Sequence, residues 1–120
     1  MTPSYQLSAP GGRCVASALR PAHTHWTRLR GLLGTRGLPA GHGLWIRPCR
    51  QVHMFWMRYA IDVVFIDDDL RVCHVEAALQ PWRVSPKIAA ATSVIELPAG
   101  AADAHGLAVG QQLTIEPVAA

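Results

Sequence analysis

Charged residues are scarce in this sequence. Only 16% of the 120 residues are charged and half are hydrophobic, which argues against disorder over most of the chain. The net charge of +3 is a small basic excess that disfavours nucleic-acid binding. The length fits one domain with a single core.

Cysteines and long apolar runs are also few. Cys14, Cys49 and Cys73 are an odd number without CxxC spacing, so a complete disulfide framework within one chain is excluded. The first twenty residues have no basic start and no uninterrupted apolar stretch typical of a signal peptide. No run approaches the roughly 20 apolar residues of a membrane helix. We therefore expect a cytoplasmic protein with reduced thiols and no membrane span.

The common motifs of catalysis and cofactor binding are missing. No GxSxG, GxxxxGK or GxGxxG pattern occurs, and Asp67–Asp69 lacks the later glycine and glutamate of a calcium loop. Cys73 and His74 are neighbours in a predicted strand, where they point to opposite faces and cannot share one ion without a bulge. We expect no metal and no cofactor.

Turn residues divide the chain into short segments. Residues 1–12 have little periodicity and are predicted to be a disordered or loosely packed tail, followed by a single β-rich domain over residues 13–118. Thr24 is expected to cap a short helix carrying Trp26, Leu29 and Leu33, and residues 99–105 suit one or two helical turns. Short strands are predicted at residues 14–19, 44–46, 51–57, 61–66, 70–75, 93–97 and 112–116. This pattern is typical of a small antiparallel β-sandwich or barrel with one or two short helices.

The densest group of functional side chains lies between residues 49 and 66. If residues 51–57 are extended, large side chains occupy both faces, so His53 is either a hydrogen-bonded histidine in a central buried strand or a catalytic base. Asp62 interrupts an apolar strand, and a buried carboxylate needs a partner. Arg58 is the nearest candidate, as a structural pair or as a ligand clamp beside His53.

A second group surrounds Trp82 and Arg83, which follow Pro81 in a predicted loop. An exposed tryptophan beside an arginine can stack on a sugar, a peptide or a base, but it can equally plug one end of a small barrel. We take the candidate ligand-binding residues to be His53, Trp56, Arg58, Asp62, Trp82 and Arg83.

The order of several motifs resembles one known family. The motifs are Leu29-Arg-Gly-Leu-Leu-Gly34, Gly41-His-Gly-Leu-Trp-Ile46, Val52-His-Met-Phe-Trp-Met-Arg-Tyr-Ala-Ile-Asp-Val-Val-Phe-Ile-Asp67, Pro81-Trp-Arg83, Val94-Ile-Glu-Leu-Pro-Ala-Gly100 and Gly106-Leu-Ala-Val-Gly110. Together they resemble domain of unknown function 192, a family of uncharacterised bacterial and archaeal proteins. The resemblance implies a small β-rich sandwich or barrel and no established activity, with Glu96 in the motif Val94–Gly100.

The leading hypothesis is a non-catalytic binding or accessory module. Its His53, Arg58 and Asp62 cluster would receive a small anionic, sugar-like or peptide ligand, or the chain would serve a protein partner. The alternatives are a hydrolase-like enzyme, with His53 as general base and Asp62 as its orienter, and a weak nucleic-acid binder. We expect a monomer or a weak dimer.

Overall fold

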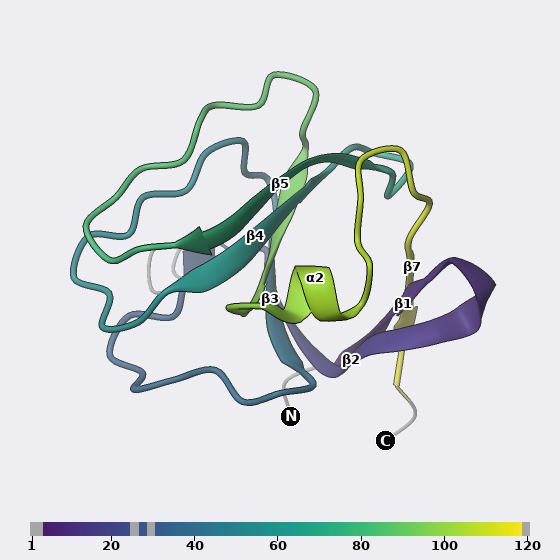
Figure 1. Cartoon of the computed structure of the whole chain (residues 1–120), viewed down its shortest axis with the longest axis horizontal. Coiled ribbons are helices and arrows are strands. Elements are labelled where there is room, and N and C mark those ends of the chain that lie inside the picture. The colour runs from purple at the N-terminus through teal and green to yellow at the C-terminus, as the bar shows by residue number, and fades with distance from the viewer. Residues whose placement is uncertain (1–3, 25–26, 29–30, 119–120) are drawn as a thin grey trace.

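The chain folds into one mixed β-sheet with short helical turns (Figure 1). The computed structural model describes residues 4–24, 27–28 and 31–118. The sheet order is β5-β4-β6-β3-β2-β1-β7. The prediction of a mainly β domain with one or two short helices is confirmed. The elements are β1 (Tyr5–Ala9), the 3-10 turn η1 (Pro10–Gly12), β2 (Arg13–Ala22), β3 (His42–Ile46), β4 (Ile61–Ile66), β5 (Val72–Leu79), β6 (Ser93–Pro98), α2 (Ala101–Ala104) and β7 (Thr114–Pro117).

The pairing of the strands differs in part from the expected antiparallel sandwich or barrel. Neighbouring strands are antiparallel except β2 and β3, which are parallel and therefore need the long glycine-rich crossover between them. The sheet does not close into a barrel, because β5 and β7 stand at opposite ends of its order. An isolated bridge between Arg71 and Gln112 joins the regions beside these two strands at one corner.

Apolar side chains cover both faces of the central strands. Successive residues of a strand point to opposite faces, so β4 sends alternate side chains into two separate core clusters. This explains why β4 is buried along its whole length. The first cluster includes Leu7, Leu19, Val64, Ile66, Leu97 and Ala102, and the second includes Leu32, Leu44, Met54, Met57, Val63 and Val94.

The N-terminal segment is more ordered than predicted. Residues 5–12 are not a loose tail: Tyr5–Ala9 forms β1, which pairs with both β2 and β7, and Leu7 is fully buried. A five-residue strand shows little alternation by itself. Its second partner lies at the far end of the chain, so local sequence does not reveal the pairing.

Two predicted helix signals can be compared with the structure. Thr27 donates its backbone N–H to the Thr24 hydroxyl at 3.1 Å, which is the expected capping bond. The rest of that predicted helix, including Trp26 and Leu29, lies largely outside the described residues. α2 falls within the predicted range 99–105 and ends before Gly106, whose φ of +63° favours glycine.

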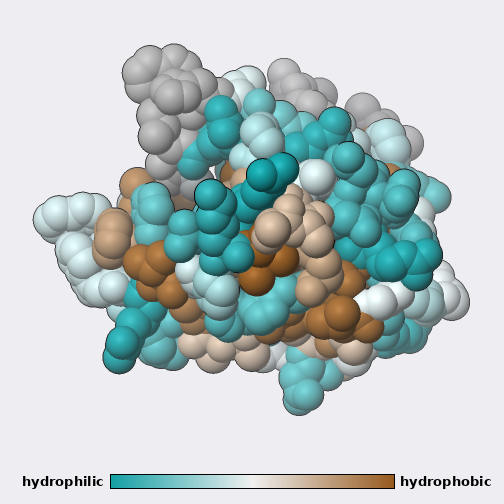
Figure 2. All heavy atoms as spheres, turned by 90° about the horizontal axis from the view of Figure 1, so that it is seen from above, coloured by the Kyte–Doolittle hydropathy of each residue, from teal (hydrophilic) through white to brown (hydrophobic). Residues whose placement is uncertain are grey.

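The surface mixes hydrophobic and hydrophilic residues. Seen from above, hydrophobic residues form patches between hydrophilic ones (Figure 2). No helix within the described ranges is long and apolar enough to cross a membrane.

Candidate functional site

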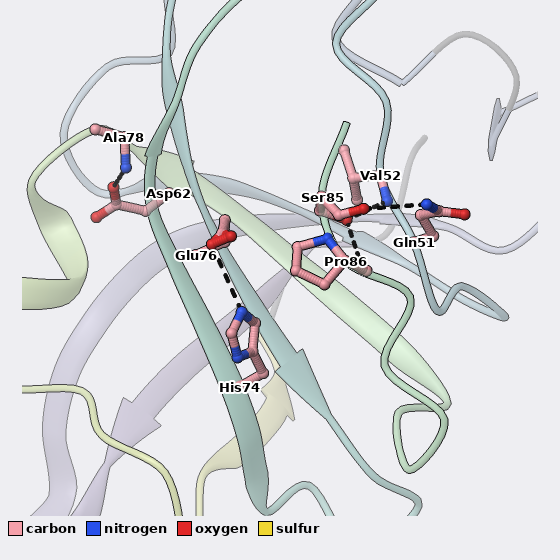
Figure 3. A network of polar contacts seen from close by, with 8 residues as sticks. All are labelled: Gln51, Val52, Asp62, His74, Glu76, Ala78, Ser85 and Pro86. Carbon is pink, nitrogen blue, oxygen red and sulfur yellow. Dashed lines mark hydrogen bonds and ion pairs between the residues drawn. The ribbon is translucent and has the colours of Figure 1, made fainter. Parts of the chain in front are cut away.

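Two loops that are far apart in sequence lie side by side beyond the ends of β3 and β5, residues 47–60 and residues 80–92 (Figure 1). Met54 donates its backbone N–H to the carbonyl of Arg83, and Ser85 donates its backbone N–H to the carbonyl of Val52, both at 2.8 Å. The buried Ser85 hydroxyl accepts the Val52 N–H at 2.9 Å (Figure 3). These bonds hold the two loops together without making them part of the main sheet.

The predicted strand at residues 51–57 is wrong. Only His53 makes a β-bridge, to Val84, and Trp56 has a φ of +67° that ends the extended run. Met57 then donates its N–H to the Met54 carbonyl in a turn. The segment keeps a partial alternation, with Val52 and Met54 buried and His53 exposed. His53 is therefore a surface residue and not a core histidine.

A pocket of about 220 Å³ lies under the first loop, on the face of the sheet that carries the second core cluster. Its apolar wall includes Leu32, Met54 and Met57. A pocket of this size suits one small molecule, since it lies below the usual range for drug-sized ligands. The polar residues that line it are Arg28, Cys49, Gln51, His53 and Glu96.

Glu96 is the most unusual polar residue of this pocket. It lies in β6 between Leu44 of β3 and Val63 of β4, and the residue is only 5% exposed. Burial raises the pKa of its carboxyl from 4.5 to about 7, and no hydrogen bond from the described residues offsets that burial. Near neutral pH the carboxyl is therefore present in both its neutral and its charged form.

Cys49 lies in the same pocket, near Glu96 and Arg28. Burial has the largest effect and raises the pKa of its thiol; a backbone hydrogen bond at Gln51 and the charge of Arg28 lower it, and the charge of Glu96 raises it. The net shift is upward, so the thiol stays protonated at neutral pH. A protonated thiol is a poor nucleophile, which argues against covalent catalysis by Cys49.

The hydrogen-bond partners of Asp62 are backbone groups that the sequence did not indicate. Its carboxylate accepts three backbone N–H groups, from Ala78 at 2.8 Å, Gly100 at 3.0 Å and Ala102 at 2.9 Å. Figure 3 shows the bond to Ala78. These bonds satisfy a carboxylate that is 1% exposed, and they hold the start of α2 against β4.

The expected cluster of His53, Arg58 and Asp62 is therefore not formed. In β4, Asp62 lies on the same face as Val64 of the first core cluster, whereas the pocket beside His53 lies on the face of the second cluster. The one salt bridge among the described residues joins His74 and Glu76, so Arg58 does not pair with Asp62. The predicted hydrolase dyad of His53 and Asp62 is wrong for the same reason.

Trp82 does not plug a barrel end. Trp82 is 55% exposed, Trp56 is 74% exposed and Phe55 is 43% exposed, and Arg58 and Arg83 are exposed beside them. The rings of His53 and Phe55 stack at 5.1 Å, and the rings of Trp56 and Trp82 meet edge to face at 4.8 Å. The structure thus brings His53, Trp56 and Trp82 together and leaves Asp62 out.

Metal ligands are not gathered anywhere in the described part of the chain. No group of three His, Cys, Asp or Glu side chains is placed to hold an ion there. Cys73 donates its thiol to the Phe65 carbonyl at 3.3 Å, while His74 contacts Glu76 at 3.6 Å. The two neighbours thus have separate partners.

Comparison with known proteins identifies the family. The family model DUF192, described as "Uncharacterized ACR, COG1430", matches residues 7–115. The chain belongs to this family, as its motifs predicted. A relative from Thermococcus sibiricus, named a UPF0127 protein, is 29% identical over 110 residues, covering 88% of this chain and 70% of the relative.

Two solved structures share the fold. A protein of unknown function from Novosphingobium aromaticivorans matches with a TM-score of 0.79 and 20% identity, over 92% of this chain and 83% of that one. A protein from Sinorhizobium meliloti, described as a "putative transcription regulator", matches with a TM-score of 0.77 and 21% identity, over 95% of this chain and 93% of that one. At these identities the likeness shows the fold alone.

Glu96, Cys49 and Arg28 are pocket residues that were not among the candidate site residues. A signal for Glu96 was present, because it interrupts the apolar strand Ser-Val-Ile-Glu-Leu as Asp62 interrupts its own strand. Cys49 and Arg28 carry no comparable signal, since neither stands in a regular pattern.

Proposed function

We propose that this chain is a non-catalytic binding module whose Glu96 pocket receives a small, hydroxyl-rich ligand of the sugar-like class. The observation that carries the proposal is the Glu96 carboxyl, which lines a small pocket, has its pKa raised to about 7 by burial and accepts no hydrogen bond from the described residues. Burying such a group without a partner costs free energy. A ligand hydroxyl that donates to this carboxyl would remove that cost.

The other walls of the pocket suit the same ligand class. His53 and Phe55 line its mouth and stack on each other, which offers an aromatic surface to the apolar face of a sugar ring. Charge does not favour an anionic ligand, because the ionised form of Glu96 lines the pocket together with Arg28. A peptide fits less well because the pocket has room for only one small unit.

The hydrolase alternative loses its main support. It required Asp62 to orient His53, and Asp62 instead binds three backbone amides on the other face of the sheet. The Cys49 thiol, whose pKa is raised, does not replace the missing nucleophile. Glu96 remains as a single ionisable carboxyl, whereas glycoside hydrolysis ordinarily uses a pair.

An amide-resolved NMR titration with pools of monosaccharides and polyols tests this proposal. We expect shifts clustered at residues 31–33, 49–57 and 94–97, and an affinity at least about tenfold lower in Glu96→Gln, since a hydrogen bond to a charged group is lost. Asp103→Asn, which changes an exposed carboxylate on α2, serves as the matched control and should bind as wild type.

Two results would overturn the proposal. One is a folded wild-type spectrum that no sugar or polyol pool perturbs at the pocket. The other is a Glu96→Gln variant that binds the same ligand with unchanged affinity.

A further inference from the structure

The two loops beside the pocket also carry an exposed aromatic cluster, which consists of His53, Phe55, Trp56 and Trp82. The rings form a continuous series, with centroid separations of 5.1 Å from His53 to Phe55, 6.2 Å from Phe55 to Trp82, and 4.8 Å from Trp82 to Trp56. Val84, which is 49% exposed, adds apolar surface next to His53 through their β-bridge. Exposed apolar side chains that are contiguous in this way mark interaction surfaces.

The backbone conformation at both tryptophans supports a role in binding and not in folding. Trp56 and Trp82 have φ values of +67° and +70°, a region that bulky side chains rarely occupy. Hydrogen bonds hold these conformations, because Trp82 donates its N–H to the Met54 carbonyl at 2.8 Å and Met57 donates to the same carbonyl at 3.2 Å. Both tryptophan rings stay exposed, so the strained backbone does not serve to bury them. Backbone strain of this kind is often found at functional sites.

The charges next to the aromatic cluster are positive. Arg58 and Arg83 follow Trp56 and Trp82 closely in sequence and are exposed, and neither forms a salt bridge with a described residue. Residues 47–61 and 77–95 contain no Asp or Glu. The other basic residues of these loops, Arg47, Arg50 and Lys87, line a second pocket together with Asp68, so the argument rests on Arg58 and Arg83.

We propose that the aromatic cluster docks this protein on the surface of an anionic lipid membrane. Tryptophan and phenylalanine insert readily at the boundary between headgroups and acyl chains, and flanking arginines are attracted to anionic lipids. These two loops would contact the membrane surface, and the mouth of the Glu96 pocket would lie close to that surface. This inference is independent of the ligand proposed for that pocket.

The geometry favours a membrane over two other occupants. Single-stranded nucleic acid stacks its bases on presented ring faces, but here the Trp56 and Trp82 planes meet at 62° and those of Phe55 and Trp82 at 40°. A second copy of the chain on a two-fold axis would bring like charges together at Arg58 and Arg83. Insertion into a headgroup layer requires neither parallel rings nor a complementary protein surface.

Vesicle flotation of the full chain tests the proposal. One set of vesicles is pure phosphatidylcholine, and the other is an equal mixture of phosphatidylcholine and phosphatidylserine. We expect binding to the mixed vesicles only, with a blue shift of the tryptophan emission, and weaker binding as salt is added. The Trp56→Ala/Trp82→Ala double variant should bind about tenfold less.

Matched variants separate the membrane contact from a loss of folding. Val109→Ala and Arg20→Gln change exposed residues elsewhere and should leave binding unchanged, whereas Arg58→Gln/Arg83→Gln should weaken it about tenfold or more. Glu96→Gln should also bind vesicles as wild type, which keeps this test distinct from that of the pocket. Circular dichroism confirms the fold of each variant.

Three results would overturn the proposal. The first is a folded wild-type chain that does not float with mixed vesicles. The second is binding that the control variants reduce as much as the tryptophan pair does. The third is tighter binding to a single-stranded oligonucleotide than to mixed vesicles, with both lost in the tryptophan pair, which would assign the cluster to nucleic acid.

Discussion

The carboxylate of Asp62 in β4 accepts the backbone N–H of Ala102 in α2 at 2.9 Å, so a strand residue caps a helix that follows it by about forty positions in the chain. Ala78 and Gly100 donate to the same carboxylate. This arrangement ties two separate segments, β5 and the start of α2, to one buried carboxylate in β4. It also explains why a carboxylate interrupts an otherwise apolar strand.

Replacement of Asp62 should destabilise the fold. We expect Asp62→Ala to lower the free energy of unfolding by about 3 kcal/mol, because it leaves three N–H groups without their partner. Asp62→Asn should also destabilise, since the NH2 group of asparagine is a donor and would face backbone N–H groups that need an acceptor. Urea unfolding measures both, and Asp103→Asn, an exposed carboxylate, should change stability by less than about 0.5 kcal/mol. An Asp62→Ala variant as stable as wild type would contradict this role.

Local patterns predicted the β-rich class, α2 and the bounds of β4. They failed where a residue's partner is distant, as for β1 and Asp62. The first depends on pairing with β7, and the second on amides supplied by β5 and the start of α2. A pattern of neighbours does not contain such contacts.

The candidate site was predicted only in part, again because some of its contacts join residues that are distant in sequence. His53, Trp56 and Trp82 do meet, because the motifs that hold them occupy adjacent loops. Glu96 was missed as a site residue because its place over the pocket depends on the order of β3, β6 and β4 in the sheet. Alternation alone does not tell which face of the sheet carries the pocket.

The pH dependence of stability should reveal Glu96. Its pKa rises from 4.5 in the unfolded chain to about 7 in the fold, so the folded protein holds this proton more tightly. Stability from this group is therefore present below about pH 4.5 and is lost as pH rises to about 7. The loss amounts to about 3 kcal/mol. Glu96→Gln should remove this slope, and denaturant unfolding across the pH range measures it; an unchanged slope would argue against a buried ionisable carboxyl.

Gly43 in β3 has no room for a side chain. A methyl group there would meet side-chain carbons of Leu19 and Leu97 at 3.0 Å and the Glu96 carbonyl oxygen at 3.1 Å. We expect Gly43→Ala to destabilise by roughly 1–3 kcal/mol through overpacking. Gly37→Ala meets nothing within 4 Å and is the control. Thermal melts compare the two, and equal melting temperatures would show that the strands around β3 pack more loosely.

The left-handed backbone at Trp56 gives a separate prediction. Glycine adopts this conformation without strain, so Trp56→Gly should be more stable than Trp56→Ala by about 1 kcal/mol. A tryptophan needed for folding would give a different result, with both variants strongly destabilised. Urea denaturation of the two variants beside wild type distinguishes these outcomes.

The most direct test of the central claim follows the Glu96 carboxyl carbon by NMR as pH is varied, with and without a sugar or polyol ligand. The free protein should titrate with a midpoint near 7, as burial without a partner requires. A bound ligand should lower that midpoint, because hydroxyl donors stabilise the ionised form. A midpoint near 4.5, or one that no ligand moves, would contradict a buried carboxyl that awaits a hydrogen-bond donor in this pocket.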